Sequence, residues 1–324
     1  MSSFFSNNAF PKKILLGLQE GNCNLSCPKC YTHGSNQISS NTRPNGIMPF
    51  DQFIKLLDEC VPFQPRIAPQ TWDEPLLNSN ILEYLSEIKK RKLVTTMDTN
   101  GILLNDKAAN ALIDLSVDSV FISLDAMTED TYSKVRGHKR FFSMVQNAVL
   151  RLLKMRGDKM FPRIGVSYVI EDENEHELES FINFWTPLVD VVRVNKKFEA
   201  GRKIRADVSS TIRTPCWSLY DSLMIHYDGS AALCCVDNHY ENSLGNVFTN
   251  GVSSVWNGSY FQKARQDHEN GDLSRLKICQ SCDLWTNNKS NVTETTSLLI
   301  SETLTHKYYN KKSRLSNISD NRYL

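Results

Sequence analysis

The sequence predicts an α/β fold with a parallel sheet, followed by a smaller module. From residue 14 to about 195, short apolar runs alternate with segments whose apolar residues recur at the helical period. Six strand–helix pairs in series are typical of a parallel sheet, either curled into a partial barrel or doubly wound. Polar residues also follow most of the predicted strands, where parallel α/β proteins place their chemistry.

Each predicted strand is short and apolar, and an amphipathic segment separates it from the next. We expect strands at residues 14–18, 66–69, 93–98, 119–124, 164–170 and 189–194. We expect the intervening helices around residues 51–60, 81–88, 108–115, 141–154 and 178–185, where the apolar side chains share one helical face.

Composition narrows the class of protein. The 324 residues are 40% hydrophobic and 23% charged, as in ordinary globular proteins, and the net charge of +1 gives no reason to propose nucleic acid or an anionic membrane as a partner. No stretch approaches the ~18 apolar residues of a membrane span. Nine cysteines without an apolar signal segment indicate a reducing compartment, so we expect a cytoplasmic protein.

Three cysteines at close spacing follow the first predicted strand. Cys23, Cys27 and Cys30 are separated by three and two residues, so their thiolates can hold one inorganic centre. A [4Fe–4S] cluster has four irons and normally takes four ligands, so three thiolates would leave one iron open. The alternative is a structural zinc site completed by His33.

The ends of the next strands carry polar residues that the fold would bring to one rim. Taken singly, each is as well explained as a helix cap or turn residue. Their joint placement on successive strands predicts a site for an amino-acid nucleoside. The groups are Trp72-Asp73-Glu74-Pro75, Thr99-Asn100-Gly101, Ser123-Leu124-Asp125 and, on the fifth strand, Ser167-Tyr168.

The cysteine loop, with aromatic Tyr31 after its last cysteine, resembles that of the radical S-adenosylmethionine (radical SAM) family. The resemblance covers residues 14 to about 200 and implies a partial (β/α)6 TIM-type barrel. It also implies a [4Fe–4S] cluster on Cys23, Cys27 and Cys30, whose open iron binds the amino and carboxylate groups of SAM.

The same resemblance assigns SAM contacts along the rim. Trp72 and Asp73 depart from the family's Gly-Gly-Glu-Pro motif by replacing both glycines. Arg136 would pair with the methionine carboxylate, a role that suits a guanidinium. The full set of implied cofactor-binding residues is Tyr31, Glu74, Asn100, Ser123, Asp125, Arg136 and Ser167.

A second cysteine set lies in residues 210–285. Two apolar runs joined by Asp228-Gly229 predict a β-hairpin that ends at Cys234-Cys235. With the closing Cys279-x2-Cys282 pair, this module resembles the SPASM/Twitch extension, a small α+β domain. The resemblance implies an auxiliary [4Fe–4S] cluster on Cys216, Cys234, Cys279 and Cys282. A four-thiolate zinc site is the alternative.

Two cysteines remain outside these sets. Cys60 lies on an apolar helix face and is interpreted as a buried hydrophobic residue. Strand alternation would point Cys235 away from Cys234, so Cys235 is a candidate hydrogen-atom donor to a substrate radical. The alternative is that either Cys234 or Cys235 ligates the cluster and the other only packs.

The resemblance implies a radical SAM dehydrogenase or epimerase. A 5′-deoxyadenosyl radical would take a hydrogen atom from a carbinol carbon of a carbohydrate-like or aminocyclitol-like substrate, with an external electron donor such as flavodoxin or ferredoxin. Only 13 residues precede the first strand, which leaves no room there for a leader-peptide-binding domain. The alternatives are a peptide-modifying enzyme (an epimerase or a cross-linking maturase) and a non-catalytic zinc-binding protein.

The last segment, residues 286–324, is rich in Ser, Thr, Asn and Lys. This composition predicts a loosely ordered C-terminal tail, with at most a short helix over residues 297–305.

Overall fold

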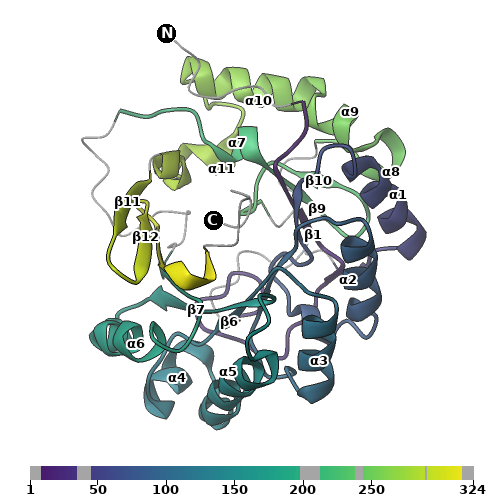
Figure 1. Cartoon of the computed structure of the whole chain (residues 1–324). Helices are drawn as coiled ribbons and strands as arrows, with labels where there is room; N and C mark the ends of the chain where they lie inside the picture. The colour runs from purple at the N-terminus through teal and green to yellow at the C-terminus, as the bar shows by residue number, and fades with distance from the viewer. Residues whose placement is uncertain (1–8, 35–44, 198–211, 238–243, 289, 316–324) are drawn as a thin grey trace.

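The computed structural model describes residues 9–34, 45–197, 212–237, 244–288 and 290–315. Six parallel strands follow one another in sequence order around a curved sheet (Figure 1), joined between the second and third by the single bridge Ile67–Thr95. This sequential order is that of a partial barrel, and it replaces the doubly wound alternative. The strands are β1 (Lys13–Leu16), β4 (Arg66–Ala68), β5 (Thr96–Thr99), β6 (Ser119–Ser123), β7 (Arg163–Ile170) and β8 (Val191–Lys196).

Helices cover the outer face of this sheet (Figure 1), and the hydrophobic core lies between the two layers. The five predicted helices are confirmed, and α4 is a sixth helix that was not predicted. The side chain of Thr128 caps its N-terminus, and Gly137 ends it with a φ of 87°, which suits glycine. They are α1 (Phe50–Cys60), α2 (Ile81–Lys90), α3 (Asp106–Asp114), α4 (Glu129–Arg136), α5 (Phe142–Arg156) and α6 (Leu178–Trp185).

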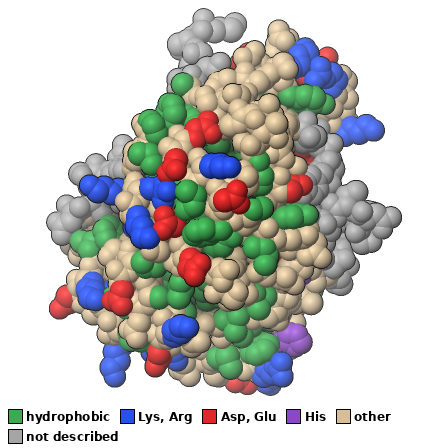
Figure 2. Space-filling model, turned by 90° about the vertical axis from the view of Figure 1, so that its right-hand side faces the viewer, with side chains coloured by type: hydrophobic (Ala, Val, Ile, Leu, Met, Phe, Trp, Pro, Cys, Tyr) green, Lys and Arg blue, Asp and Glu red, His purple; other side chains and the backbone are tan. Residues whose placement is uncertain are grey.

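The outer surface carries charges of both signs. On the face shown in Figure 2, Lys and Arg side chains are interspersed with Asp and Glu and with hydrophobic side chains. This mixture agrees with the near-zero net charge of the chain. None of the helices in the described ranges is long and apolar enough to cross a membrane.

The second module is attached to the barrel through a shared sheet. The predicted hairpin is confirmed as β9 (Ser222–Ile225) and β10 (Ala231–Ala232), and β9 runs parallel to β1 with Leu15 opposite Met224. The rest of the module is helical: α7 (Ser218–Asp221), α8 (Val247–Asn250), α9 (Val252–Trp256), α10 (Ser259–Asn270) and α11 (Lys277–Gln280).

Residues 290–315 are ordered, and for them the prediction of a loose tail is wrong. It forms an antiparallel unit of β11 (Asn291–Glu294), β12 (Leu298–Glu302) and β13 (His306–Lys311), and β13 pairs with β8. The expected helix over residues 297–305 is therefore mostly strand β12. Without β13, strand β8 would have an unpaired edge. Pairing with β8 gives β13 its backbone hydrogen bonds, and amino-acid composition cannot reveal such pairing.

We expect that a chain ending at residue 288, which lacks β11 to β13, is less stable by about 3 kcal/mol or more. The reason is the loss of a ladder of five residue pairs between β13 and β8, worth roughly 0.5–1.5 kcal/mol per hydrogen bond. Denaturant unfolding measures this difference. A control chain ending at residue 315 keeps the ladder and should match the full-length protein; equal stability of the shorter chain would contradict the role given to β13.

Candidate active site

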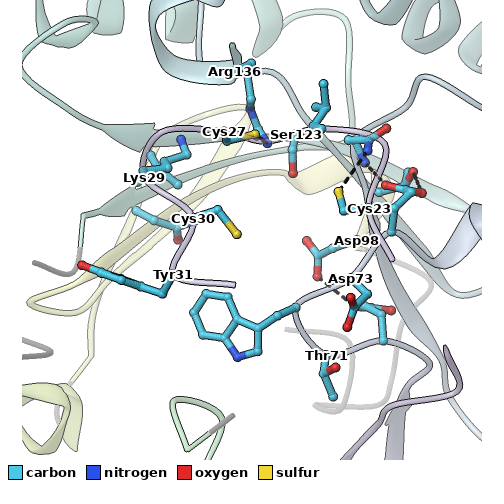
Figure 3. A pocket seen from close by; sticks show the side chains of 18 of the residues that line it. Cys23, Cys27, Lys29, Cys30, Tyr31, Thr71, Asp73, Asp98, Ser123 and Arg136 are labelled. Atoms are coloured by element: carbon cyan, nitrogen blue, oxygen red, sulfur yellow. Dashed lines mark hydrogen bonds between the residues drawn. The ribbon is translucent and has the colours of Figure 1, made fainter. Parts of the chain in front are cut away.

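A cavity of about 360 Å³ opens at the C-terminal ends of the parallel strands. The three cysteines of the first set all line it, together with polar side chains from the strand ends (Figure 3). Of the predicted SAM-contact residues, the lining includes Tyr31, Glu74, Asn100, Ser123 and Arg136. The structure thus brings five of the seven residues together with the cysteine loop.

The cysteine loop is folded tightly on its own backbone. The amide of Cys30 donates to the carbonyl of Cys27 at 2.9 Å, and the amide of Gly34 donates to the carbonyl of Cys30 at 3.0 Å. A Cβ on Gly34 would lie 2.0 Å from the Cys27 carbonyl oxygen, so only glycine fits there. Burial raises the pKa of the Cys23 thiol to about 12. A thiolate at Cys23 therefore needs a cationic partner, which iron supplies.

A buried carboxylate holds this loop against the barrel. Asp125 is fully buried and forms ion pairs with Lys29 of the loop and, at 2.7 Å, with Arg136 of α4. It also accepts a hydrogen bond of 2.8 Å from the amide of Val169 on β7. Burial by itself would raise the pKa of Asp125, but the charges of Arg136 and Lys29 bring the pKa below its usual value.

Asp125 does not line the cavity, and its expected contact with SAM or substrate stays a prediction. Its carboxylate is used to position Lys29 and Arg136, two long side chains from distant parts of the sequence. Ser167 is likewise outside the lining, and its hydroxyl donates to that of Ser123 at 3.3 Å. Asp125 and Ser167 therefore contact side chains that do line the cavity: Lys29 and Arg136 for Asp125, and Ser123 for Ser167.

The carboxylate of Glu74 organises the ends of β4 and β5. It accepts hydrogen bonds from the Thr99 hydroxyl and the Asn100 amide, both at 2.6 Å, and from the Leu76 amide at 3.1 Å. Burial raises the pKa of Glu74. The Asn100 side chain then donates to Asn24 of the cysteine loop at 2.6 Å. Glu74 and Asn100 therefore fix the loop against the rim.

The two residues that replace the family's glycines both form specific contacts. The Asp73 carboxylate accepts from the Gly21 amide at 3.0 Å and bonds His33 Nε2 at 2.8 Å, so it holds both ends of the cysteine loop. The Trp72 indole donates to the Cys235 carbonyl at 2.9 Å. Neither residue adopts a positive φ, so the turn does not use the left-handed region that glycine would supply. Neither contact could be predicted from the sequence, because the partners are distant in the chain.

A separate pocket brings the second cysteine set together. Cys216, Cys234, Cys279 and Cys282 all line it, together with mainly apolar side chains. Burial raises the pKa of Cys234 well above its usual value, and burial also raises that of Cys216. Four thiols of this kind fit a cationic cluster that takes four thiolates. No group of three or more His, Cys, Asp or Glu within the described residues is placed to hold a single metal ion.

Cys235 lies apart from both pockets. Strand β10 ends at Ala232, so Cys234 and Cys235 are in a turn and strand alternation does not set their directions. Cys235 lines neither cavity. Burial raises the pKa of its thiol, and the charge of Lys13 lowers that pKa. The strand alternation on which the prediction for Cys235 was based is therefore absent, because the strand is shorter than the apolar run, and the role of Cys235 as a hydrogen-atom donor stays a prediction.

Comparisons with known proteins agree with this geometry. The family model described as the radical SAM superfamily matches residues 21–184, just over half of the chain. The chain belongs to the radical SAM superfamily. A second model, the SPASM iron–sulfur cluster-binding domain, matches residues 216–283. This membership argues against the alternative interpretation of the cysteine spacing, a non-catalytic zinc-binding protein.

Curated relatives of this radical SAM protein are distant. An uncharacterised protein of Treponema pallidum is 26% identical over 73% of this chain and 69% of its own length. A tungsten-containing aldehyde ferredoxin oxidoreductase cofactor-modifying protein of Pyrococcus furiosus is 28% identical over 53% of the chain. A GTP 3′,8-cyclase of Clostridium perfringens is 26% identical over 50%. The chain spans about half the length of these last two relatives.

Solved structures share the fold. BtrN in complex with AdoMet and 2-DOIA gives a TM-score of 0.55 at 15% identity, covering 84% of this chain and 93% of that one. Streptococcus suis SuiB bound to S-adenosylmethionine gives 0.66 at 14% identity, covering 84% and 72%. The partial barrel with an appended SPASM domain is therefore a known architecture.

The family and its SPASM domain imply three cofactors: SAM, the [4Fe–4S] cluster that binds it, and an auxiliary [4Fe–4S] cluster. The donor sets fit them. Three thiols line the main cavity, and the buried Nε of Arg136, which also lines it, has no hydrogen-bond partner among the described residues. The assignment of individual ligands and SAM contacts is our proposal.

We expect Asp125→Asn to reduce stability by about 3–5 kcal/mol, because it leaves the buried Arg136 without its carboxylate partner and Lys29 with Glu171 alone. The folded pKa of Asp125 lies below the unfolded value of about 3.9, so the carboxylate stabilises the fold above that pH and its contribution is lost as the pH falls through the folded pKa. Denaturant unfolding between pH 7 and 3 measures both effects. Asp106→Asn, at an exposed ion pair, is the control and should change stability by less than about 1 kcal/mol.

Iron analysis after anaerobic reconstitution tests the two cysteine sets. Two four-iron clusters predict about eight irons per chain, and Cys279→Ala should lower this to about four. Cys60→Ala is the matched control at a fully buried cysteine outside both sets and should keep about eight. Cys235→Ala should behave like this control; a loss of about four irons would instead make Cys235 a ligand.

Proposed function

We propose that this radical SAM enzyme oxidises a carbinol carbon of a small carbohydrate-like or aminocyclitol-like substrate. When bound, the first cluster and SAM supply a 5′-deoxyadenosyl radical, which removes a hydrogen atom from a substrate C–H. Oxidation of an alcohol to a ketone removes one hydrogen atom, one proton and one electron. The auxiliary cluster, when bound, would accept the electron, and the chain's own residues must bind the polyol, exclude water and accept the proton.

The observation that carries this proposal is the composition of the main cavity. Its wall beside the cysteines offers hydroxyl, amide and carboxylate groups from the ends of several strands, a surface suited to a substrate with many hydroxyl groups. Two named curated relatives support a small molecule, because their names refer to GTP and to a cofactor.

Asp98 is the best placed acceptor for the hydroxyl proton. Three carboxylates line the cavity, and two of them are occupied by the loop contacts described above: Asp73 with 6% of its side chain exposed and Glu74 with 3% of its surface exposed. The Asp98 side chain is 37% exposed. It forms an ion pair with Arg193, and a carboxylate that lines the cavity is a suitable group for general-base chemistry.

Cavity geometry favours oxidation over epimerisation. An epimerase returns a hydrogen atom to the opposite face of the substrate radical, and Cys235 was the candidate donor for that step. Because Cys235 does not line the cavity, a dehydrogenase activity is better supported than an epimerase activity. A peptide-modifying enzyme is the remaining alternative, and the experiment below separates it.

The test uses the reconstituted enzyme, SAM, a reductant and a panel of perdeuterated polyols and aminocyclitols. Deuterium in the 5′-deoxyadenosine product is the expected result, and with protiated substrate the ketone should be two mass units lighter than the alcohol. Asp98→Asn should still bind SAM but form ketone at least about tenfold more slowly, as expected for loss of a general base. Deuterium transfer only from peptides, or an epimer in place of a ketone, would contradict the proposal.

A further inference from the structure

A second cavity, of about 400 Å³, lies inside the barrel and meets the first. Asp98 and His306 line both cavities. Alternate residues of all six parallel strands line the second cavity, while the residues between them, such as Ile14 and Ile67, belong to the hydrophobic core. With a period of two along each strand, the lining residues face the concave side of the sheet. We name this cavity the inner chamber.

The C-terminal strands close one side of the inner chamber. Leu299 and Ser301 of β12 and Tyr308 and Asn310 of β13 are part of its lining. The segment that composition suggested was a loose tail therefore forms a wall of the barrel interior. The residues of this segment that line the chamber are uncharged, so the charge of the chamber comes from the parallel strands.

The inner chamber is strongly cationic. Lys13, Arg66, Arg163 and Arg193 line it, whereas Asp98 is its one lining carboxylate within the described residues. Burial, and next the charge of Arg193, lower the pKa of His306 to about 4, so this histidine is neutral at pH 7. The lining thus carries three more positive than negative charges.

Within the described ranges, the carboxylate behind this wall is shared with cations outside the chamber. Asp190, which lies near Arg163, already forms ion pairs with Arg156 and Arg314. Asp98 is paired with Arg193, whose guanidinium also stacks on the Phe121 ring at 4.3 Å. Gly165 makes room for that ring, since a Cβ there would lie 2.6 Å from it. The position of Arg193 is therefore fixed by packing.

Lys13 is the least compensated cation. Its ammonium has no hydrogen bond or ion pair within the described part of the chain, and Arg66 lies directly across the β1–β4 pair. Burial, and next the charge of Arg66, lower the pKa of Lys13. Clustering buried like charges costs free energy, which a bound anion would offset.

We propose that the inner chamber binds an oxyanion, phosphate or carboxylate, of the substrate whose reactive carbon lies in the main cavity. This inference rests on the proposed function and narrows its substrate to a phosphorylated or carboxylated polyol. Lys13 and Arg66 would bind the oxyanion, and Arg193, held by Asp98 and Phe121, would stand between it and the reacting group.

The test measures binding of inorganic phosphate, pyrophosphate and malonate to the reconstituted enzyme with SAM by isothermal titration calorimetry. Saturable binding of at least one anion is expected, and it should weaken as salt is raised. Lys13→Gln and Arg66→Gln should each weaken binding at least about tenfold, the usual consequence of losing a charge-assisted hydrogen bond. Preference for the phosphates or for malonate identifies the kind of oxyanion.

Lys12→Gln is the matched control, because Lys12 is the exposed neighbour of Lys13 and should bind anions like the wild type. Thermal stability and SAM binding without anion show whether each variant is folded; Lys13→Gln should retain both. Absence of saturable binding by all three anions, or equal binding by folded Lys13→Gln, overturns the anion site. An enzyme that binds the anion but takes deuterium from no polyol overturns the proposed function and leaves the anion site standing.

Discussion

The buried carboxylate of Asp125 is the constraint on which the active-site side of the barrel depends. It joins the cysteine loop through Lys29, helix α4 through Arg136 and strand β7 through the Val169 amide. These segments are far apart in the sequence. Without Asp125, Arg136 would lose its carboxylate partner, the Val169 amide would lose its acceptor, and Lys29 would keep only Glu171. A single carboxylate can hold all three because its two oxygens offer several acceptor positions.

The position of the second cysteine set relative to the first depends on a second buried group. Glu20, just before the cysteine loop, accepts a hydrogen bond from the Tyr227 amide at 3.0 Å and bonds His226 Nδ1 at 2.9 Å, both in the hairpin. Thr71 donates to the same carboxylate at 3.0 Å, and the neighbouring Trp72 bonds the Cys235 carbonyl. Together with the parallel pairing of β9 and β1, these contacts make the SPASM hairpin part of the barrel wall.

The sequence predicted what depends on local pattern. Apolar periodicity located the six parallel strands and five of the helices, and cysteine spacing located both thiol sets. It did not reveal which polar groups pair, because Asp73 meets His33 and Asp125 meets Lys29 only after folding. It also failed for β12 and β13, whose polar residues face the barrel interior and whose stability comes from pairing with β8.

The central claim is that the three-cysteine loop supports radical chemistry with SAM. The most direct measurement is the formation of 5′-deoxyadenosine and methionine by the anaerobically reconstituted, reduced protein. The account predicts equal amounts of both products, and their loss in Cys27→Ala. A fully iron-loaded protein that leaves SAM intact under reduction would contradict it.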